Sequence, residues 1–297
     1  MWHVHAACPC HTAPLGGQGL ADAPCPRCAG GVTSVRLSAD RASALARSAV
    51  ADLAREVARV VVPVECAGCG ALDEVLCDDC SIPLRSTPWR CEDGAPRLDR
   101  LDGVPPFPVW TLLTYSGVAR DLVLGWKDRG RADLTRPLCA ALRRAAGDRA
   151  EPLRQALSTG HGASQAIHVV PVPSSPAARR RRGADLVRRL AASVAGGLVE
   201  RGVPARLDPC LATAGAARDQ VGLGVSGRQR NRARSVRLRG SLPPGVVVVL
   251  VDDVVTTGAT LAACERAVAS GGGLVVGALV LAATPRPTRS ISGWRDR

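Results

Sequence analysis

Aromatic residues and lysine are scarce in this chain of 297 residues. Phe, Trp and Tyr make up 2% of the sequence, and Lys127 is the only lysine among 39 basic residues. With so few rings, a surface that stacks the successive bases of a single strand is hard to build. The composition therefore weighs mildly against direct reading of single-stranded nucleic acid.

Long apolar runs are also absent. No run reaches the roughly 18 residues that a membrane-spanning helix needs, and the segment 274–283 is long enough only for a buried strand. The first residues lack the basic stretch and apolar core of a signal peptide, so we expect a cytoplasmic protein. In that compartment the 12 cysteines are expected to be metal ligands or inert thiols rather than disulfides.

Acidic residues are outnumbered by basic ones, and the formal net charge is +13. This excess favours polyanionic ligands such as pyrophosphate, nucleotides or nucleic acid. The length suits one large domain or two smaller ones.

The most informative segment follows the turn at Pro244 and Gly245. Four apolar residues, 248–251, predict the end of a buried strand, and the carboxylates Asp252 and Asp253 come next. A short turn then leads into an alanine-rich helix predicted over 261–269. The turn consists of Thr256, Thr257, Gly258, Ala259 and Thr260.

This order of residues predicts a site for a phosphorylated sugar. Backbone N–H groups at a helix N-terminus favour a phosphate, through unpaired donors and the helix dipole. Gly258 lets the backbone approach the ligand closely. Asp252 and Asp253 are suited to bind ribose hydroxyls, directly or through Mg²⁺.

Other interpretations of this segment fit less well. A Walker B strand requires a phosphate-binding loop with lysine, and Lys127 stands in Gly125-Trp126-Lys127-Asp128, which does not match. A receiver-type acidic pocket lacks the Thr-Thr-Gly-Ala-Thr turn. A purely structural strand, turn and helix, with the acids as caps, remains the plain alternative.

Two Cys-x-x-Cys pairs predict a zinc module. The ligands are Cys66, Cys69, Cys77 and Cys80, in the spacing C-x₂-C-x₇-C-x₂-C. Two such knuckles supply four thiolates to a tetrahedral Zn²⁺, which would provide the folding energy of so small a module. A redox pair is the alternative for one Cys-x-x-Cys alone. Cys91 is either a replacement ligand or a bystander.

The N-terminal residues offer a weaker pattern. A second zinc site could form from Cys8, Cys10 or His11, Cys25 and Cys28, but without apolar periodicity we favour a disordered extension over 1–45. An amphipathic helix is predicted over 43–62. The predicted organisation is an extension (1–45), the helix with the zinc module (46–104), a ligand-binding domain (105–285) and a tail (286–297).

The rest of the chain alternates strands and helices. Strands are predicted over 109–115, 167–173, 245–251 and 274–281, and helices over 119–126, 133–146 and 185–199. This alternation predicts an α/β fold with a mostly parallel sheet, flanked by helices, whose ligands bind at the carboxyl ends of the strands. Residues 206–240 are rich in arginine and predict a mobile loop. The Gly222, Gly224 and Gly227 spacing within it resembles a dinucleotide fingerprint only by letters, because no strand precedes it.

A pyrophosphate subsite is predicted at the end of the strand over 167–173. The prolines fix a rigid turn, and arginines bind phosphate oxygens through two donors at once. A run of four arginines over 179–182 is either a solvated helix start or part of this subsite, and the arginines of 218–232 suit a basic lid. The predicted pyrophosphate-binding residues are Pro171, Val172, Pro173, Arg179, Arg182, Arg218, Arg228 and Lys127.

Taken in order, these motifs resemble the ComF family of phosphoribosyltransferase-like proteins. The resemblance covers about residues 60–285, and the first sixty residues have no counterpart in it. Its motifs are the two Cys pairs, Tyr115-Ser-Gly, Trp126-Lys127, Pro171-Val-Pro173, Arg182-Gly183, Gln220, Arg228, Asn231 and the Asp252–Thr260 loop. Ala184 replaces the aromatic residue usual after Arg-Gly in the family.

The resemblance implies a type I phosphoribosyltransferase-like domain that binds phosphoribosyl pyrophosphate (PRPP) with Mg²⁺, with Asp252 and Asp253 as the catalytic pair that holds the ribose. It also implies a link to DNA uptake in competent bacteria. Two activities remain open. One is transfer of phosphoribosyl to an acceptor that the sequence does not identify. The other is a non-catalytic role in DNA uptake through contact with single-stranded DNA or the uptake machinery.

Overall fold

The structure of the chain is a computed structural model that describes residues 64–98, 104–159, 165–174, 180, 184–213 and 236–285. All of these residues belong to one compact unit, which begins at Arg59. The extension over 1–45 with its cysteines, the helix over 43–62 and the tail lie outside the described residues. Among the described residues, no helix combines the length and the apolar character needed to cross a bilayer.

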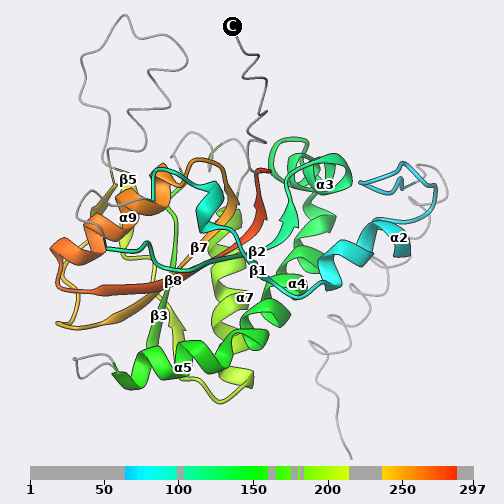
Figure 1. Cartoon of the computed structure of the whole chain (residues 1–297). Coiled ribbons are helices and arrows are strands. Elements are labelled where there is room, and N and C mark those ends of the chain that lie inside the picture. The colour runs from blue at the N-terminus through cyan, green and yellow to red at the C-terminus, as the bar shows by residue number, and fades with distance from the viewer. Residues whose placement is uncertain are drawn as a thin grey trace, which may run out of the picture. The chain divides into compact units, whose positions relative to one another are not determined.

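A six-stranded sheet forms the centre of this unit, with the strand order β1-β2-β8-β7-β3-β4 (Figure 1). The two-residue β1 is antiparallel to β2, and all other neighbours are parallel. The predicted α/β class with a mostly parallel sheet is therefore confirmed. The strands are β1 Trp89–Arg90, β2 Val109–Thr114, β3 Ile167–Pro171, β4 Ala205–Leu207, β7 Val247–Val255 and β8 Leu274–Ala283.

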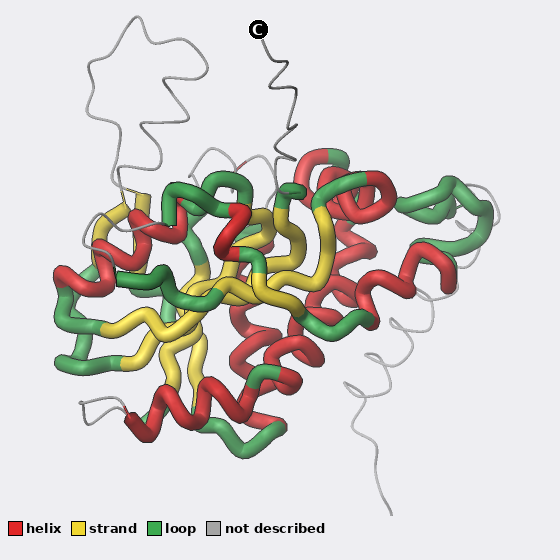
Figure 2. Tube along the Cα trace, viewed as in Figure 1, coloured by secondary structure: helices red, strands yellow, loops and turns green. Residues whose placement is uncertain are grey.

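Helices cover both faces of the sheet (Figure 2). In the central strand β7, Val247, Val249 and Val251 contribute to one apolar core, while Val248 and Leu250 contribute to the other. A strand buried on both faces must be apolar at every position, which explains the continuous valine run of β7. The longer helices are α3 Gly117–Asp128, α4 Thr135–Asp148, α5 Ala150–Thr159, α7 Leu186–Glu200 and α9 Ala259–Ser270.

Helices α4 and α7 cross closely on the first face. A Cβ atom added to Gly197 would lie 2.0 Å from the carbonyl oxygen of Arg143, so only glycine fits at this crossing. Ala146 lies at the same crossing, with its Cβ 3.2 Å from a Cβ atom added to Gly197. The alanine-rich composition of these segments is thus a packing requirement, since small side chains permit the contact.

The structure adds short elements to those predicted. Two small pieces lie at the second cysteine pair: α2 Asp78–Ser81, which contains Cys80, and a 3₁₀ helix that follows it, Ile82–Arg85. The other additions are 3₁₀ helices at Glu92–Gly94 and Ala132–Leu134, the helix α5 and the strands β1 and β4.

The prediction of one mobile loop over 206–240 is wrong at both ends. β5 Leu211–Thr213 and β6 Val236–Leu238 pair there as an antiparallel ladder. Leu211 and Ala212 are buried, so even this short apolar stretch supports a strand. The residues 214–235 between the two strands lie outside the described part.

Candidate functional site

The order in which the chain adds strands to the sheet reverses between β3 and β7. The chain leaves β3 through α7, which packs on one face of the sheet and leads outward to β4. It leaves β7 through α9, which packs on the opposite face and leads to β8 on the other side. Two helices that diverge in this way leave a crevice at the carboxyl ends of the two strands between them, where ligands bind in open α/β sheets.

Asp252 and Asp253 lie at this edge. The ladder between β3 and β7 ends at Pro171 and Val251, and the N–H of Val172 donates to the carbonyl of Val251 at 2.8 Å. On its other side, β7 continues beside β8 to Val255. The predicted strand end at 251 is therefore correct toward β3 and wrong toward β8, where β7 runs four residues further. Asp252 and Asp253 therefore lie beyond the end of β3, in the part of β7 that still pairs with β8.

Asp253 is buried and forms an ion pair with a residue of α3. Its Oδ2 lies 2.5 Å from Nζ of Lys127, which is located near the end of α3. Only 4% of Asp253 is exposed, so a paired cation is needed to keep its charge inside the protein. The sequence assigned Lys127 to the pyrophosphate, and the structure places its ammonium group at the acidic pair.

Asp252 has different surroundings from its neighbour. Its Oδ1 accepts a hydrogen bond of 2.8 Å from the N–H of Asp253. Burial raises the pKa of Asp252 to about 8, and the charge of Asp253 adds to this rise, while Lys127 opposes it. A nearby cation or hydroxyl donors would stabilise the ionised form of this carboxyl group and so lower its pKa.

The turn after β7 presents its backbone to this edge. Gly258 has a positive φ of 76° and stands as the N-cap of α9, and the N–H of Ala259 donates to Oγ1 of Thr257 at 3.5 Å. Thr256, Thr257 and Thr260 are exposed. Within the described part of the chain, no protein acceptor pairs with the N–H groups of Thr256 and Thr260. Such unpaired donors at a helix N-terminus suit an anion.

The far side of the turn is covered by the chain itself. The N–H of Arg97 donates to the carbonyl of Thr257 at 2.9 Å. A Cβ atom on Gly258 would lie 2.6 Å from Cγ of Leu98 and 3.0 Å from Cβ of Ala95. Glycine is therefore required here by its positive φ and by packing against 95–98, and not only by close approach to a ligand as the sequence suggested.

A pocket of about 310 Å³ opens beside the end of β3. Pro171, Val172 and Pro173 line it, and their assignment to the pyrophosphate stays a prediction. The sequence did not single out the polar residues of this pocket. Asp185 was predicted as the first residue of a helix, and in the structure it is the N-cap of α7. Its carboxylate accepts a hydrogen bond of 3.3 Å from the N–H of Arg188. The remaining lining residues are Arg188, Pro209, Leu211 and Arg239.

All four arginines predicted to bind pyrophosphate lie outside the described residues. These are Arg179, Arg182, Arg218 and Arg228. Their assignment stays a prediction.

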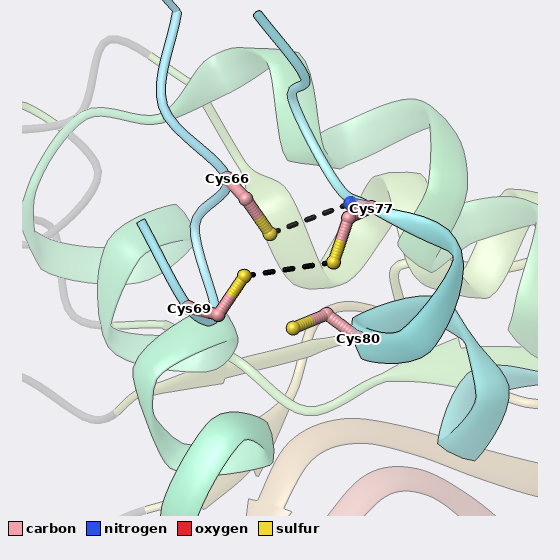
Figure 3. Close-up of side chains that lie close together, drawn as sticks. All are labelled: Cys66, Cys69, Cys77 and Cys80. Atoms are coloured by element: carbon pink, nitrogen blue, oxygen red, sulfur yellow. Dashed lines mark hydrogen bonds between the residues drawn. The ribbon is translucent and has the colours of Figure 1, made fainter. Parts of the chain in front are cut away.

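The four cysteines of the two pairs come together in one cluster (Figure 3). The Sγ atoms of Cys66, Cys69, Cys77 and Cys80 all lie within 4.8 Å of one another, and those of Cys69 and Cys77 are 3.6 Å apart. Thiolates that surround a tetrahedral Zn²⁺ are about 3.8 Å apart, given Zn–S bonds of about 2.3 Å. The cluster therefore fits a metal ion such as zinc.

Backbone donors favour the ionised form of one of these four thiols, that of Cys66. The N–H of Cys77 donates to Sγ of Cys66 at 3.3 Å. Burial alone would raise the pKa of Cys66, but this N–H and those of Cys69 and Gly68 outweigh it and lower the pKa to about 6. A thiol that ionises easily is a ready ligand.

Cys91 is not part of the cluster. Its buried thiol donates to the carbonyl of Val109 at 3.4 Å, and burial raises its pKa to about 12. Of the two predicted possibilities, bystander is correct.

Comparisons with known proteins give only distant similarities. No family model matches the sequence, and no curated protein matches it. Several solved structures show partial likeness, among them the following three. The hypoxanthine phosphoribosyl transferase of Trypanosoma cruzi aligns over 50% of this chain and 67% of its own, with 16% identity and a TM-score of 0.33. A glutamic acid mutant from a study of an invariant aspartic acid in HPRTs aligns over 48% and 67%, with 14% identity and a TM-score of 0.30.

The third structure is the adenine phosphoribosyltransferase of Leishmania donovani. It aligns over 69% of this chain and 67% of its own, with 16% identity and a TM-score of 0.27. At such values the function of this chain has to be inferred from its own residues.

Proposed function

We propose that the crevice between β3 and β7 binds PRPP with Mg²⁺ and that the protein transfers the phosphoribosyl group to an acceptor. The observation that carries this proposal is the meeting of two features at one sheet edge. The acidic pair stands where β3 ends, and the turn over 256–260 offers unpaired N–H donors a few residues further on. A ribose with a phosphate at one end and a pyrophosphate at the other needs both features, next to a basic wall.

Each group has a defined part in this proposal. The turn would bind the 5′-phosphate, and Asp252 and Asp253 would accept hydrogen bonds from the ribose hydroxyls. The rigid end of β3 and the arginines beside it would face the pyrophosphate. Carboxylate oxygens are suitable ligands for Mg²⁺, which when bound would neutralise charge on the pyrophosphate.

The proposed reaction exchanges one bond at C1 of the ribose for another. The bond from C1 to the pyrophosphate oxygen breaks, and pyrophosphate leaves with the electron pair. The acceptor donates an electron pair to C1 and loses its proton to solvent. Positive charge develops at the ribose during this exchange, as in glycoside cleavage, and the nearby carboxylates would stabilise it.

Calorimetric titration of the protein with PRPP and Mg²⁺ tests the binding step. Asp252→Asn combined with Asp253→Asn should weaken binding at least tenfold, which is about 1.4 kcal/mol. The matched control is Glu200→Gln, because Glu200 of α7 forms an exposed ion pair with Arg143 of α4, and its affinity should equal that of the wild type. Unchanged affinity in the double variant would contradict the assignment of the ribose site.

Release of pyrophosphate across a panel of nucleobases tests the transfer step. Release that depends on both PRPP and one base would support an enzyme. Its absence, together with salt-dependent binding of single-stranded oligonucleotides, would favour the non-catalytic role, for which the net charge of +13 is the supporting observation. Membership of the ComF family and a role in DNA uptake belong to this proposal. So does zinc as the metal of the cysteine cluster, held by Cys66, Cys69, Cys77 and Cys80.

A further inference from the structure

The cysteine cluster lies directly against α3. A Cβ atom on Gly68, between the first two cysteines, would be 2.7 Å from Sγ of Cys80 and 2.8 Å from Cγ1 of Val118. Val118 stands in the first turn of α3. Gly68 therefore lets the first knuckle approach the other knuckle on one side and α3 on the other.

Arg131 attaches the far end of the same helix to the cluster. Its Nη2 donates to the carbonyl of Val75, between the two knuckles, at 3.3 Å. Asp133 holds the guanidinium in place, with Nε and Nη2 at 3.0 and 2.8 Å from its Oδ2. The N–H of Arg131 also donates to the carbonyl of Gly125 in α3 at 3.1 Å. Val75 in turn accepts a hydrogen bond of 3.1 Å from the N–H of Ala67 in the first knuckle.

Lys127 lies between these two attachments. It stands on α3 after Val118 and before Arg131, and its ammonium group reaches Asp253 at 2.5 Å. The helix that carries the counter-ion of the acidic pair thus contacts the two knuckles near both its ends, while Leu122, Val123 and Trp126 bury its middle in the core.

The chain that leaves the cluster is held in another way. Arg144 of α4 donates from Nη2 to the carbonyls of Leu84 and Ser86, at 2.7 and 2.9 Å. Residues 95–98, which cover the turn at Gly258, follow beyond this anchor. The support of the turn therefore depends on α4 and the sheet, whereas the knuckles contact the helix that carries Lys127.

We propose that metal binding at the cysteine cluster positions Lys127 beside Asp253, so that the metal and PRPP bind with positive coupling. This inference rests on the proposed function. Two knuckles of this size need a metal to hold their fold, so its loss frees the loop at Val75 and the contact with Val118. Lys127 then spends less time at the acidic pair, and the protein has to order α3 before it can bind PRPP. Lys127 acts here as a positioning residue.

Coupling between two binding sites is reciprocal. If the metal strengthens PRPP binding by some factor, PRPP must strengthen metal binding by the same factor. For contacts that act through one helix we expect about tenfold, which is within the usual range of such couplings.

The test uses the full chain loaded with zinc. Calorimetry gives its affinity for PRPP with Mg²⁺, before and after treatment with a zinc-selective chelator, and circular dichroism follows the fold. Competition with a chromophoric chelator gives the zinc affinity with and without PRPP. We expect both ratios to be about ten. Cys66→Ser combined with Cys69→Ser should release the metal and show the low PRPP affinity, and a metal assay with one zinc per chain in this variant would contradict the ligand set.

A second variant separates coupling from loss of fold. Val118→Ala combined with Arg131→Ala leaves all four cysteines in place, so one zinc per chain should remain while PRPP affinity falls toward the metal-free value. The control is Arg85→Ala, whose exposed ion pair with Asp78 lies within the cysteine module, and it should change neither affinity.

The outcomes distinguish this inference from the proposed function. Equal PRPP affinity with and without metal, or full affinity in the Val118 and Arg131 variant, would overturn the coupling and leave PRPP binding intact. A zinc-loaded protein that does not bind PRPP at all would overturn the proposed function itself.

Discussion

Asp252 and Asp253 are adjacent in sequence, yet the fold treats them differently. Asp253 is buried with Lys127 as its partner, while the pKa of Asp252 is raised to about 8, first by burial and then by the charge of Asp253. A raised carboxyl pKa means that the folded protein binds a proton more tightly than the unfolded chain. The contribution of this group to the free energy of unfolding is therefore complete below its usual pKa of about 4. It decreases as the pH rises and is lost above about pH 8.

Asp252→Asn should separate stability from binding. An amide does not titrate, so the unfolding temperature of this variant should rise relative to the wild type as the pH increases from 5 to 9. PRPP affinity should respond in the opposite direction. It should increase with pH in the wild type, because the ligand favours the ionised carboxylate, and it should be low at every pH in the variant.

Thermal melting and calorimetry at a series of pH values measure the two effects. Because the comparison is between two proteins that differ at one group, other titrating residues cancel. Parallel stability curves for the two proteins would contradict the position of Asp252 in a site that raises its pKa.

The turn between β7 and α9 depends on an element far away in the sequence. Residues 95–98 pack on it through Ala95 and Leu98, and the backbone of Arg97 bonds to Thr257. The left-handed conformation of Gly258 is thus held from behind, which keeps the N–H donors of the turn directed to the sheet edge.

Gly258→Ala should destabilise the protein more than Gly272→Ala. Both glycines have a φ near +77°, so either alanine costs about 1–2 kcal/mol of backbone strain. Nothing lies within 4 Å of a Cβ atom at Gly272, whereas at Gly258 that atom would overlap Leu98 and add about 1–3 kcal/mol. Denaturant unfolding without ligand measures both, and equal losses would contradict the packing of 95–98 on the turn.

The whole molecule carries a net charge of +13, so any anion is attracted to it to some extent. A specific site differs from this general attraction in two ways. Its ligand stabilises the native state by mass action, and the effect disappears with the acidic pair rather than with the overall charge.

PRPP with Mg²⁺ should therefore raise the free energy of unfolding by about 2.7 kcal/mol at a hundred times its Kd. Pyrophosphate at the same concentration should raise it less, because it lacks the ribose that Asp252 and Asp253 bind. Melting curves with each ligand test this expectation. Equal stabilisation by both, lost together at high salt, would indicate attraction to the basic surface in place of a ribose site.

The sequence predicted several features that the structure contains. The apolar runs predicted a mostly parallel sheet, and the two Cys pairs predicted a cluster of four thiols. These are local patterns, because a strand buried on both faces must be apolar throughout and a knuckle must keep its spacing. The ligand roles of Asp252, Asp253 and the turn stay predictions.

Other features could not be predicted from the sequence. Lys127 and Asp253 are separated by more than a hundred residues, and only the packing of α3 against the sheet brings their charges together. The contact of Leu98 with Gly258 is of the same kind. The short strands within 206–240 were missed because each is only three residues long and only a few apolar residues mark it.

By itself, the sequence determined the four longest strands, where a phosphate turn and a metal cluster can form, and that the molecule is basic. These properties depend on residues that are neighbours in the chain. Only the tertiary structure decided which charge balances the acidic pair, what supports the turn and how the cysteine module is joined to both. Such contacts depend on the packing of distant elements, which is fixed by the shape of the whole core and is not written in any local pattern.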